Sequence, residues 1–155
     1  AEMCDRVIAS TTKGAYLFGR AVATYMMEKN SGHILNVRTD HVKPSPTSSR
    51  HHGHGNMDLY NASKWALNGF TFDWAKSLAK HNIRVNNLCV GATDTEMLRK
   101  WSGSNPDPEW VKSWMRPEDV AEVIINLIEE GPDGRTGDNV GLYAGFDCVL
   151  PPPEA

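Results

Sequence analysis

The chain has 155 residues, 40% of them hydrophobic, and a formal net charge of −3 at pH 7, which fits one globular domain or less. Its scattered lysines and arginines argue against a nucleic-acid or an anionic-membrane surface, and no apolar run is long enough to span a bilayer. Three cysteines, Cys4, Cys89 and Cys148, lack metal or redox spacing, so we expect reduced thiols in a cytoplasmic protein.

The predicted elements alternate between helices and buried strands. A helix is expected from about 2 to 29, followed by a short apolar strand over 32–37. A second helix is expected over 57–81, and a second apolar strand over 83–90. A strand, a helix and a strand in this order predict a parallel crossover unit.

The last third of the chain continues the alternation. A stretch rich in Trp and Pro covers 98–116, and Pro117 then opens a helix that Gly131 ends. A last strand is predicted near 139–143, before an extended proline tail at 151–153. Chemistry in such sheets gathers beyond the carboxyl ends of the strands.

Tyr60 and Lys64 form the most informative pair of the sequence. Their i, i+4 spacing places a phenol and an ammonium on one helical face, where the positive charge is expected to lower the tyrosine pKa. Such a pair can pass protons to and from a substrate oxygen. The spacing alone is also common by chance, and a surface Tyr and Lys are the alternative.

Four stretches in this order then resemble motifs of the short-chain dehydrogenase/reductase family. They are Asn36-Val37-Arg38-Thr39, Tyr60 to Lys64, Arg84-Val85-Asn86 with Val90 to Thr95, and Arg135-Thr136-Gly137. The resemblance implies an α/β fold, namely the carboxyl-terminal portion only of a Rossmann-type doubly wound parallel sheet. Residues 1–155 are expected to form a single partial domain.

The Gly-rich strand-turn-helix segment with which this family binds the cofactor pyrophosphate has no match in the chain. We expect that segment to precede Ala1 in the parent protein. The alternative is a shortened relative that does not bind a dinucleotide in the usual way.

The resemblance also implies roles for individual residues. Tyr60 is expected to be the general acid or base, and Lys64 to lower its pKa and hold the nicotinamide ribose. Thr39 stands where the family has a substrate-binding serine, and Thr11 where it often has an asparagine that anchors a relay water. A plain strand-end threonine is the alternative for Thr39. Contacts to NAD or NADP are expected from Tyr60, Lys64, Val90, Gly91, Thr93 and Thr95, with Val90 in place of the family's proline.

Two variable regions are expected at the mouth of this site. A long polar loop over 39–57 contains His51, His52 and His54, whose spacing does not support a metal site, so we predict no metal and a loop that can contact substrate. Residues 98–116 occupy the position of the family's substrate lid. Its apolar side chains form either a wall over a bulky hydrophobic substrate or ordinary packing; they are Met97, Leu98, Trp101, Trp110, Trp114 and Met115.

The expected partners are a small-molecule carbonyl or alcohol and further copies of the chain. In this family the two long helices pack against their twins, which implies a homo-oligomer, either a dimer or a tetramer. Phe18 with Tyr25, and Phe70 with Trp74, fit a second buried surface.

The leading function is therefore that of an NAD(P)-dependent oxidoreductase that interconverts a carbonyl and a secondary alcohol. One alternative is a non-redox or inactive relative that acts as a scaffold or partner subunit. Another is a cofactor-free isomerase, lyase or dehalogenase that uses the Tyr60 and Lys64 pair. The substrate, the choice between NAD and NADP, and the reaction direction stay open.

Overall fold

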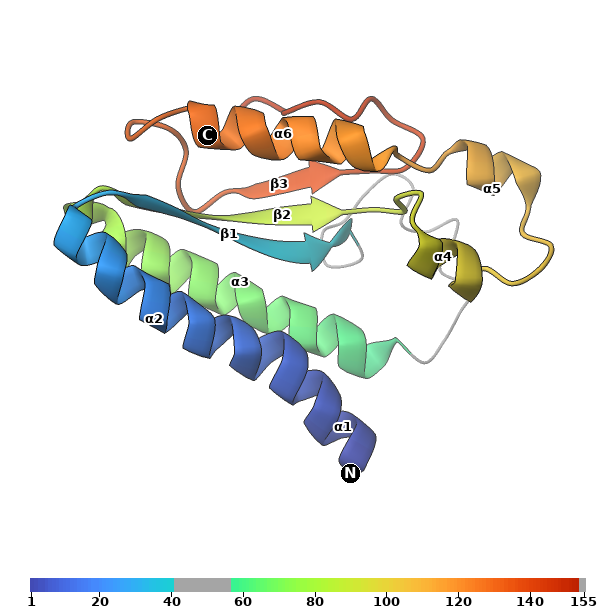
Figure 1. Ribbon diagram of the computed structural model, residues 1–155, viewed down its shortest axis with the longest axis horizontal. Coiled ribbons are helices and arrows are strands. Elements are labelled where there is room, and N and C mark those ends of the chain that lie inside the picture. Colours follow the sequence, from blue (N-terminus) through green and yellow to red (C-terminus); the bar gives the residue numbers. More distant parts are fainter. Residues whose placement is uncertain (41–56, 154–155) are drawn as a thin grey trace.

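The computed structural model describes residues 1–40 and 57–153. They form three layers, with a parallel sheet between helices on its two faces (Figure 1). Three strands lie in the order β1-β2-β3: β1 (Gly32–Thr39), β2 (Ile83–Val90) and β3 (Asn139–Leu142). The α/β class and the parallel sheet are thus confirmed.

Two long helical segments cover one face of the sheet (Figure 1). The first consists of α1 (Glu2–Val7), a π-helix η1 (Ile8–Lys13) and α2 (Gly14–Lys29), so the single helix expected there contains a wider turn. The second is α3 (Asp58–Leu78), continued by a short 3₁₀ helix, η3 (Ala79–His81).

The opposite face is covered by α6 (Pro117–Glu129) (Figure 1). Its first position is a proline, and Glu118 and Asp119 lie in its first turn, where carboxylates stabilise the positive end of the helix dipole. Two short helices, α4 (Glu96–Trp101) and α5 (Pro108–Lys112), lie beyond the carboxyl ends of the strands.

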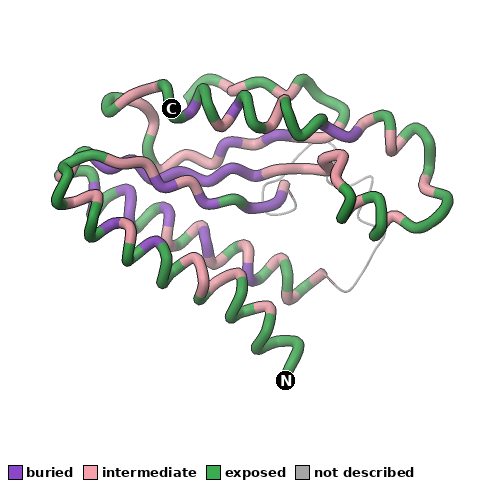
Figure 2. The backbone as a smooth tube through the Cα atoms, viewed as in Figure 1, coloured by how far each residue is buried: buried purple, intermediate pink, exposed green. Residues whose placement is uncertain are grey.

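Each face of the sheet has its own apolar core, and the central strand β2 is buried along most of its length (Figure 2). The core toward α2 and α3 consists of Ala23, Ile34, Trp74, Ala75, Leu78, Ile83 and Val85. The core toward α6 consists of Leu88, Met115, Val123, Leu127, Val140 and Leu142.

Trp74 and Phe70 belong to the first core, which corrects one expectation from the sequence. Trp74 is buried and stacks on Phe70 with 5.4 Å between ring centroids, and a Cβ on Gly19 of α2 would collide with the Trp74 ring. The Trp74 ring therefore fills the space between α2 and α3 and is not part of a second surface, while Phe70 is half-buried against this core. Phe18 and Tyr25 are exposed, as an outer surface requires.

The strand register places three chain segments at one edge. Thr39 is level with Val90, and Val90 is level with Leu142, so β1, β2 and β3 end together. β1 has a strand partner on one side only among the described residues. None of the described helices is long and apolar enough to cross a membrane.

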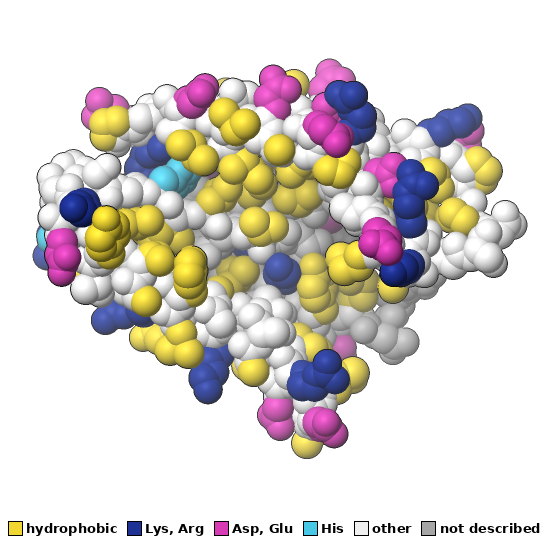
Figure 3. Space-filling view, viewed as in Figure 1, with side chains coloured by type: hydrophobic (Ala, Val, Ile, Leu, Met, Phe, Trp, Pro, Cys, Tyr) yellow, Lys and Arg dark blue, Asp and Glu magenta, His cyan; other side chains and the backbone are white. Residues whose placement is uncertain are grey.

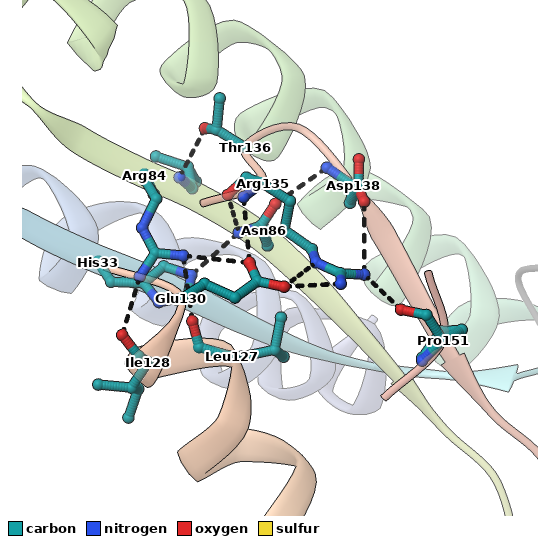
Figure 4. A network of polar contacts seen from close by, with 11 residues as sticks. His33, Arg84, Asn86, Leu127, Ile128, Glu130, Arg135, Thr136, Asp138 and Pro151 are labelled. Carbon is teal, nitrogen blue, oxygen red and sulfur yellow. Dashed lines mark hydrogen bonds and ion pairs between the residues drawn. The ribbon is translucent and has the colours of Figure 1, made fainter. Parts of the chain in front are cut away.

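A polar network ties α6 to the amino-terminal half of the strands (Figure 4). Glu130 contacts Arg84 at 3.6 Å and Arg135 at 2.6 Å, and Arg84 also donates hydrogen bonds to two carbonyl oxygens at the end of α6. Next to it, the Asn86 side-chain nitrogen lies 3.0 Å from His33 Nε2. Burial, and after it the Arg84 charge, lowers the pKa of His33 to about 4, so the imidazole is neutral.

Candidate active site

The first turn of α3 lies against the carboxyl end of β1, and this contact joins Tyr60 to Thr39. The Tyr60 hydroxyl makes a side-chain hydrogen bond with Thr39, the last residue of the strand. The register then places Thr39 beside Val90, which Gly91 follows. Three of the predicted site residues from separate segments thus meet at one edge of the sheet.

Lys64 lies one turn further along α3. Its Nζ is 5.8 Å from the centroid of the Tyr60 ring, as the i, i+4 spacing predicts. The same nitrogen donates a hydrogen bond to the carbonyl oxygen of Val37 at 2.9 Å. This bond fixes the ammonium beside the strand and uses one of its three donors.

The electrostatics of the pair differ from the expectation. Burial raises the pKa of Tyr60, the Asp40 charge raises it further, and the hydrogen bond with Thr39 lowers it. The expected lowering by Lys64 is therefore wrong for this arrangement, because desolvation of the phenolate outweighs it. Burial also lowers the pKa of Lys64, and the neighbouring Arg38 charge lowers it further.

Asp40 is a site residue that sequence reasoning missed. Its carboxylate accepts a hydrogen bond from the Thr39 hydroxyl at 3.3 Å. A Cβ on Gly91 would lie only 2.9 Å from the other carboxylate oxygen, so Asp40 reaches the turn after β2. The sequence indicated Asp40 only by its position directly after Thr39, the last residue of the strand. The family resemblance pointed to the Thr39 hydroxyl alone.

The turn after β2 requires glycine at position 91. The Gly91 N–H donates to the Leu142 carbonyl oxygen at 2.9 Å, and a Cβ there would lie 3.1 Å from that same oxygen. The Thr93 hydroxyl donates to the Gly91 carbonyl oxygen at 3.1 Å. Thr93 also forms a bridge with Met115, which ties the turn to the segment that follows α5.

Two other residues predicted to contact the cofactor, Thr95 and Val90, make contacts within the fold. Thr95 caps α4, because its hydroxyl accepts the Leu98 N–H at 3.3 Å. Val90 packs partly against the core toward α6. Both lie on the stretch that leaves the carboxyl end of β2, on the side predicted for the nicotinamide.

A groove of about 620 Å³ runs between α2, η1 and β1. Thr11 and Lys64 line it together, along with Phe18, Val22, His33 and Asn36. Figure 3 shows this face of the molecule, with hydrophobic side chains along a hollow between the helices and the sheet. The structure thus brings Thr11, the predicted relay position, into the groove that Lys64 enters.

The predicted lid separates into a buried part and an exposed part. Trp114 is buried, and Met115 belongs to the core toward α6, so these two are packing residues and not a free wall. Met97 and Trp101 are 79% and 56% exposed. Trp110 joins the two parts, with ring centroids 6.5 Å from Trp101 and 5.0 Å from Trp114. His51, His52 and His54 lie outside the described residues.

Comparison with known proteins shows which family's sequences match the part of the chain that contains this site. The family model described as "short chain dehydrogenase" matches residues 1–105. The 3-oxoacyl-[acyl-carrier-protein] reductase FabG of Thermotoga maritima is 30% identical over 146 residues, which cover 92% of this chain and 56% of that protein. The curated relatives compared are matched over 50% to 59% of their length, so the chain spans little more than half of them.

Solved structures give the same result. The TT0495 protein of Thermus thermophilus superposes with a TM-score of 0.74 at 29% identity, covering 94% of this chain and 61% of that one. The structure titled "ElxO with NADP Bound" has a TM-score of 0.72 at 24% identity and covers 88% and 54% of the two chains, which shows a shared fold.

Proposed function

Because the chain belongs to the short-chain dehydrogenase/reductase family, we propose that its protein is an NAD(P)-dependent oxidoreductase that interconverts a carbonyl and a secondary alcohol. The observation that carries the proposal is the contact of Tyr60 with Thr39 beside Lys64, at the carboxyl ends of parallel strands. The substrate is a small molecule, and the exposed Met97 and Trp101 favour one with a bulky hydrophobic part.

In the proposed reduction, the Tyr60 hydroxyl donates its proton to the carbonyl oxygen, and in oxidation the phenolate accepts it. A pKa raised by burial and by Asp40 keeps the phenol protonated, which suits the acid. The Thr39 hydroxyl is hydrogen-bonded to Tyr60, and its oxygen can accept a hydrogen bond from a substrate alcohol. To donate to a carbonyl oxygen, its single hydrogen would turn from Asp40 to the substrate. A nicotinamide, when bound, would supply or accept the hydride at the carbonyl carbon.

The described residues fit the nicotinamide side of a dinucleotide. Lys64 has ammonium donors beyond the one that Val37 accepts, and these can bind ribose hydroxyls. Gly91 lets the backbone approach closely where a side chain has no room. Val90 ends β2, and Thr93 and Thr95 lie on the segment that connects β2 to α4. The NADP in the ElxO structure supports a nicotinamide cofactor, with the choice between NAD and NADP open.

The adenosine and pyrophosphate contacts would come from a part of the protein beyond this chain, since relatives are nearly twice as long. The one-sided pairing of β1 and the groove beside it mark where further strands of a doubly wound sheet can pair. Exposed Phe18 and Tyr25 on α2, with Trp65 and Phe72 on α3, favour a homo-oligomer formed through these helices.

The test is a screen of the full-length natural protein with NADH and NADPH against aldehydes and ketones of increasing apolar size, followed by absorbance at the nicotinamide band. Turnover with a bulky apolar ketone is expected. Binding of neither cofactor, together with no turnover, would contradict the oxidoreductase. Turnover of a substrate without cofactor would favour the isomerase, lyase or dehalogenase alternative.

A further inference from the structure

Arg38 is a buried cation in the polar layer between the sheet and α3. Only 3% of it is exposed, and its side chain extends from β1 under the turn of α3 that carries Lys64. It stands second to last in the strand, directly before Thr39. Neither the acid-base pair nor the cofactor contacts described above make use of it.

The contacts of Arg38 join three elements. Its Nε donates to the Lys64 carbonyl oxygen at 3.2 Å. Its Nη1 donates to the Asn68 side chain of α3 at 2.8 Å and to the Asn139 side chain of β3 at 2.6 Å. The guanidinium carbon also lies 5.5 Å from the centre of the Trp65 ring, in cation–π geometry.

These contacts leave the charge poorly compensated. Every hydrogen-bond acceptor is a neutral amide or carbonyl oxygen, and Nη2 is buried with no hydrogen-bond partner in the described part of the chain. Arg84, the other buried arginine of the sheet, has Glu130 at 3.6 Å and two further carbonyl oxygens. Burial of an unpaired charge is costly, so fold stability alone would favour an uncharged residue at position 38.

The place of the charge indicates what Arg38 does. The Lys64 carbonyl and the Asn68 side chain lie one turn apart, in the first half and at the middle of α3, so the planar guanidinium fixes this turn of the helix to β1 and β3 at once. In the described part of the chain, the charge that acts on Lys64 is that of Arg38 from β1. Tyr60 from the same helix lies beside Lys64, with Asp40 acting on that phenol, and His33 from β1 and the uncharged Thr11 from η1 line the same groove. His33 is neutral, so Arg38 brings the second positive charge.

We propose that Arg38 is a positioning residue for the Tyr60 and Lys64 pair, which anchors the turn of α3 from Lys64 to Asn68 to the sheet and holds a second cation beside Lys64. The effect of Arg38 on catalysis rests on the proposed function. The anchoring of α3 and the second cation beside Lys64 do not. The Arg38 charge contributes to the lowered pKa of Lys64, after burial. A destabilised ammonium gives up its proton more readily, which suits a lysine that exchanges protons with a neighbouring phenol.

The test measures Lys64 directly, by titration of ¹³C-methylated lysine amines in the NMR spectrum of the full-length natural protein, with assignment by Lys64→Arg. Three variants of position 38 are compared: Arg38→Met and Arg38→Gln remove the charge, and Arg38→Lys keeps it. Arg84→Met is the matched control, because it also removes a buried arginine but lies in the network around Glu130. Chemical unfolding of each variant reports the loss of stability.

We expect Lys64 in the unaltered chain to titrate below the usual lysine range, and its pKa to rise in Arg38→Gln and Arg38→Met but not in Arg38→Lys or Arg84→Met. If Arg38→Met does not fold, Arg38→Gln decides. An unaltered Lys64 that titrates at or above the usual range would overturn the proposal. So would neutral variants that lose stability as Arg84→Met does while the Lys64 pKa stays constant, since Arg38 would then only fill the core.

A second readout uses turnover in the full-length natural protein. Arg38→Gln is expected to lower kcat about tenfold or more with little change in KM, because a displaced acid-base pair affects the chemical step. If the unaltered protein has no redox activity, the proposed function fails, yet the Lys64 titration still decides the structural part of the proposal. An unchanged kcat together with a raised Lys64 pKa would overturn its catalytic part.

Discussion

The ammonium nitrogen of Lys64 lies 2.9 Å from the carbonyl oxygen of Val37, so the lysine side chain lies along β1 instead of extending into solvent. The backbone carbonyl of Lys64 is held by Arg38 at 3.2 Å. Both ends of this residue are thus bound to the same strand. The pair that the sequence places on a helix face is fixed by the strand beneath it.

This geometry predicts a specific effect of Lys64→Met in the full-length protein. The variant keeps the apolar stem and removes the donors, so we expect cofactor binding to weaken about tenfold or more, the usual scale for lost charged hydrogen bonds. Titration calorimetry with NAD and NADP measures it. Lys100→Met is the control, since Lys100 pairs with Glu96 on the exposed face of α4. Equal affinities in the two variants would argue against a ribose contact by Lys64.

Asp40 predicts a change in the acidity of Tyr60. Its negative charge contributes to the raised pKa of the phenol, so Asp40→Asn should lower that pKa. The activity that depends on the protonated phenol should then be lost at lower pH than in the unaltered protein. NMR of ¹³C-labelled tyrosine follows the titration directly. Asp94→Asn, whose carboxylate pairs with Arg99, should leave Tyr60 unchanged. A Tyr60 pKa that rises or stays constant in Asp40→Asn would contradict this arrangement.

His33 predicts how stability depends on pH. Its folded-state pKa is about 4, compared with 6.5 for an unperturbed histidine. Between these values the unfolded chain binds a proton that the folded chain does not, so stability falls as pH decreases from 6.5 to 4. Allowing for partial solvent contact, the loss is on the order of 1 to 3 kcal/mol. Urea unfolding at several pH values should show a smaller decrease in His33→Gln. An equal decrease in both proteins would show that the imidazole is not held neutral.

The sequence was sufficient for much of this account. The order of helices and strands follows from their apolar segments, and the parallel sheet from the strand, helix, strand order. The segment from Ile83 to Val90 is buried on both faces, although Arg84, Asn86 and Asn87 interrupt its apolar residues. The contact of Tyr60 and Lys64 follows from helix geometry. The meeting of Thr39 with Val90 follows from strands that end together.

Other features depend on tertiary structure and were not predictable. The direction of the Tyr60 pKa is set by burial under neighbouring segments and by Asp40, neither of which a local spacing reveals. Phe70 with Trp74 fitted a second buried surface by sequence, yet Gly19 makes room for the Trp74 ring between α2 and α3, and Phe70 stacks on that ring. Arg38 stands at a motif position where the family has a serine, so the motif gave no role for an arginine there. Its partners Asn68 and Asn139 are distant in sequence.

The unpaired side of β1 predicts the behaviour of the 155-residue chain on its own. We expect it to bind NAD or NADP no more tightly than about 0.1 mM, because it supplies only the nicotinamide side of the site. It should also self-associate, since the described residues leave one edge of β1 without a strand partner and a groove beside α2. Calorimetry and light scattering test the two parts together. Low-micromolar binding by a monomer would show that the dinucleotide site is built differently.

The most direct test of the central claim is hydride transfer in the full-length protein with Tyr60 intact and replaced. NAD(P)H deuterated at C4 is supplied with a carbonyl substrate, and mass spectrometry follows deuterium at the carbinol carbon of the product. We predict transfer of one deuterium, as deuteride, by the unaltered protein, and a rate lower by roughly 100-fold or more in Tyr60→Phe with cofactor binding and folding retained. Undiminished transfer in Tyr60→Phe, or no transfer by the unaltered protein to any carbonyl offered, would contradict the account.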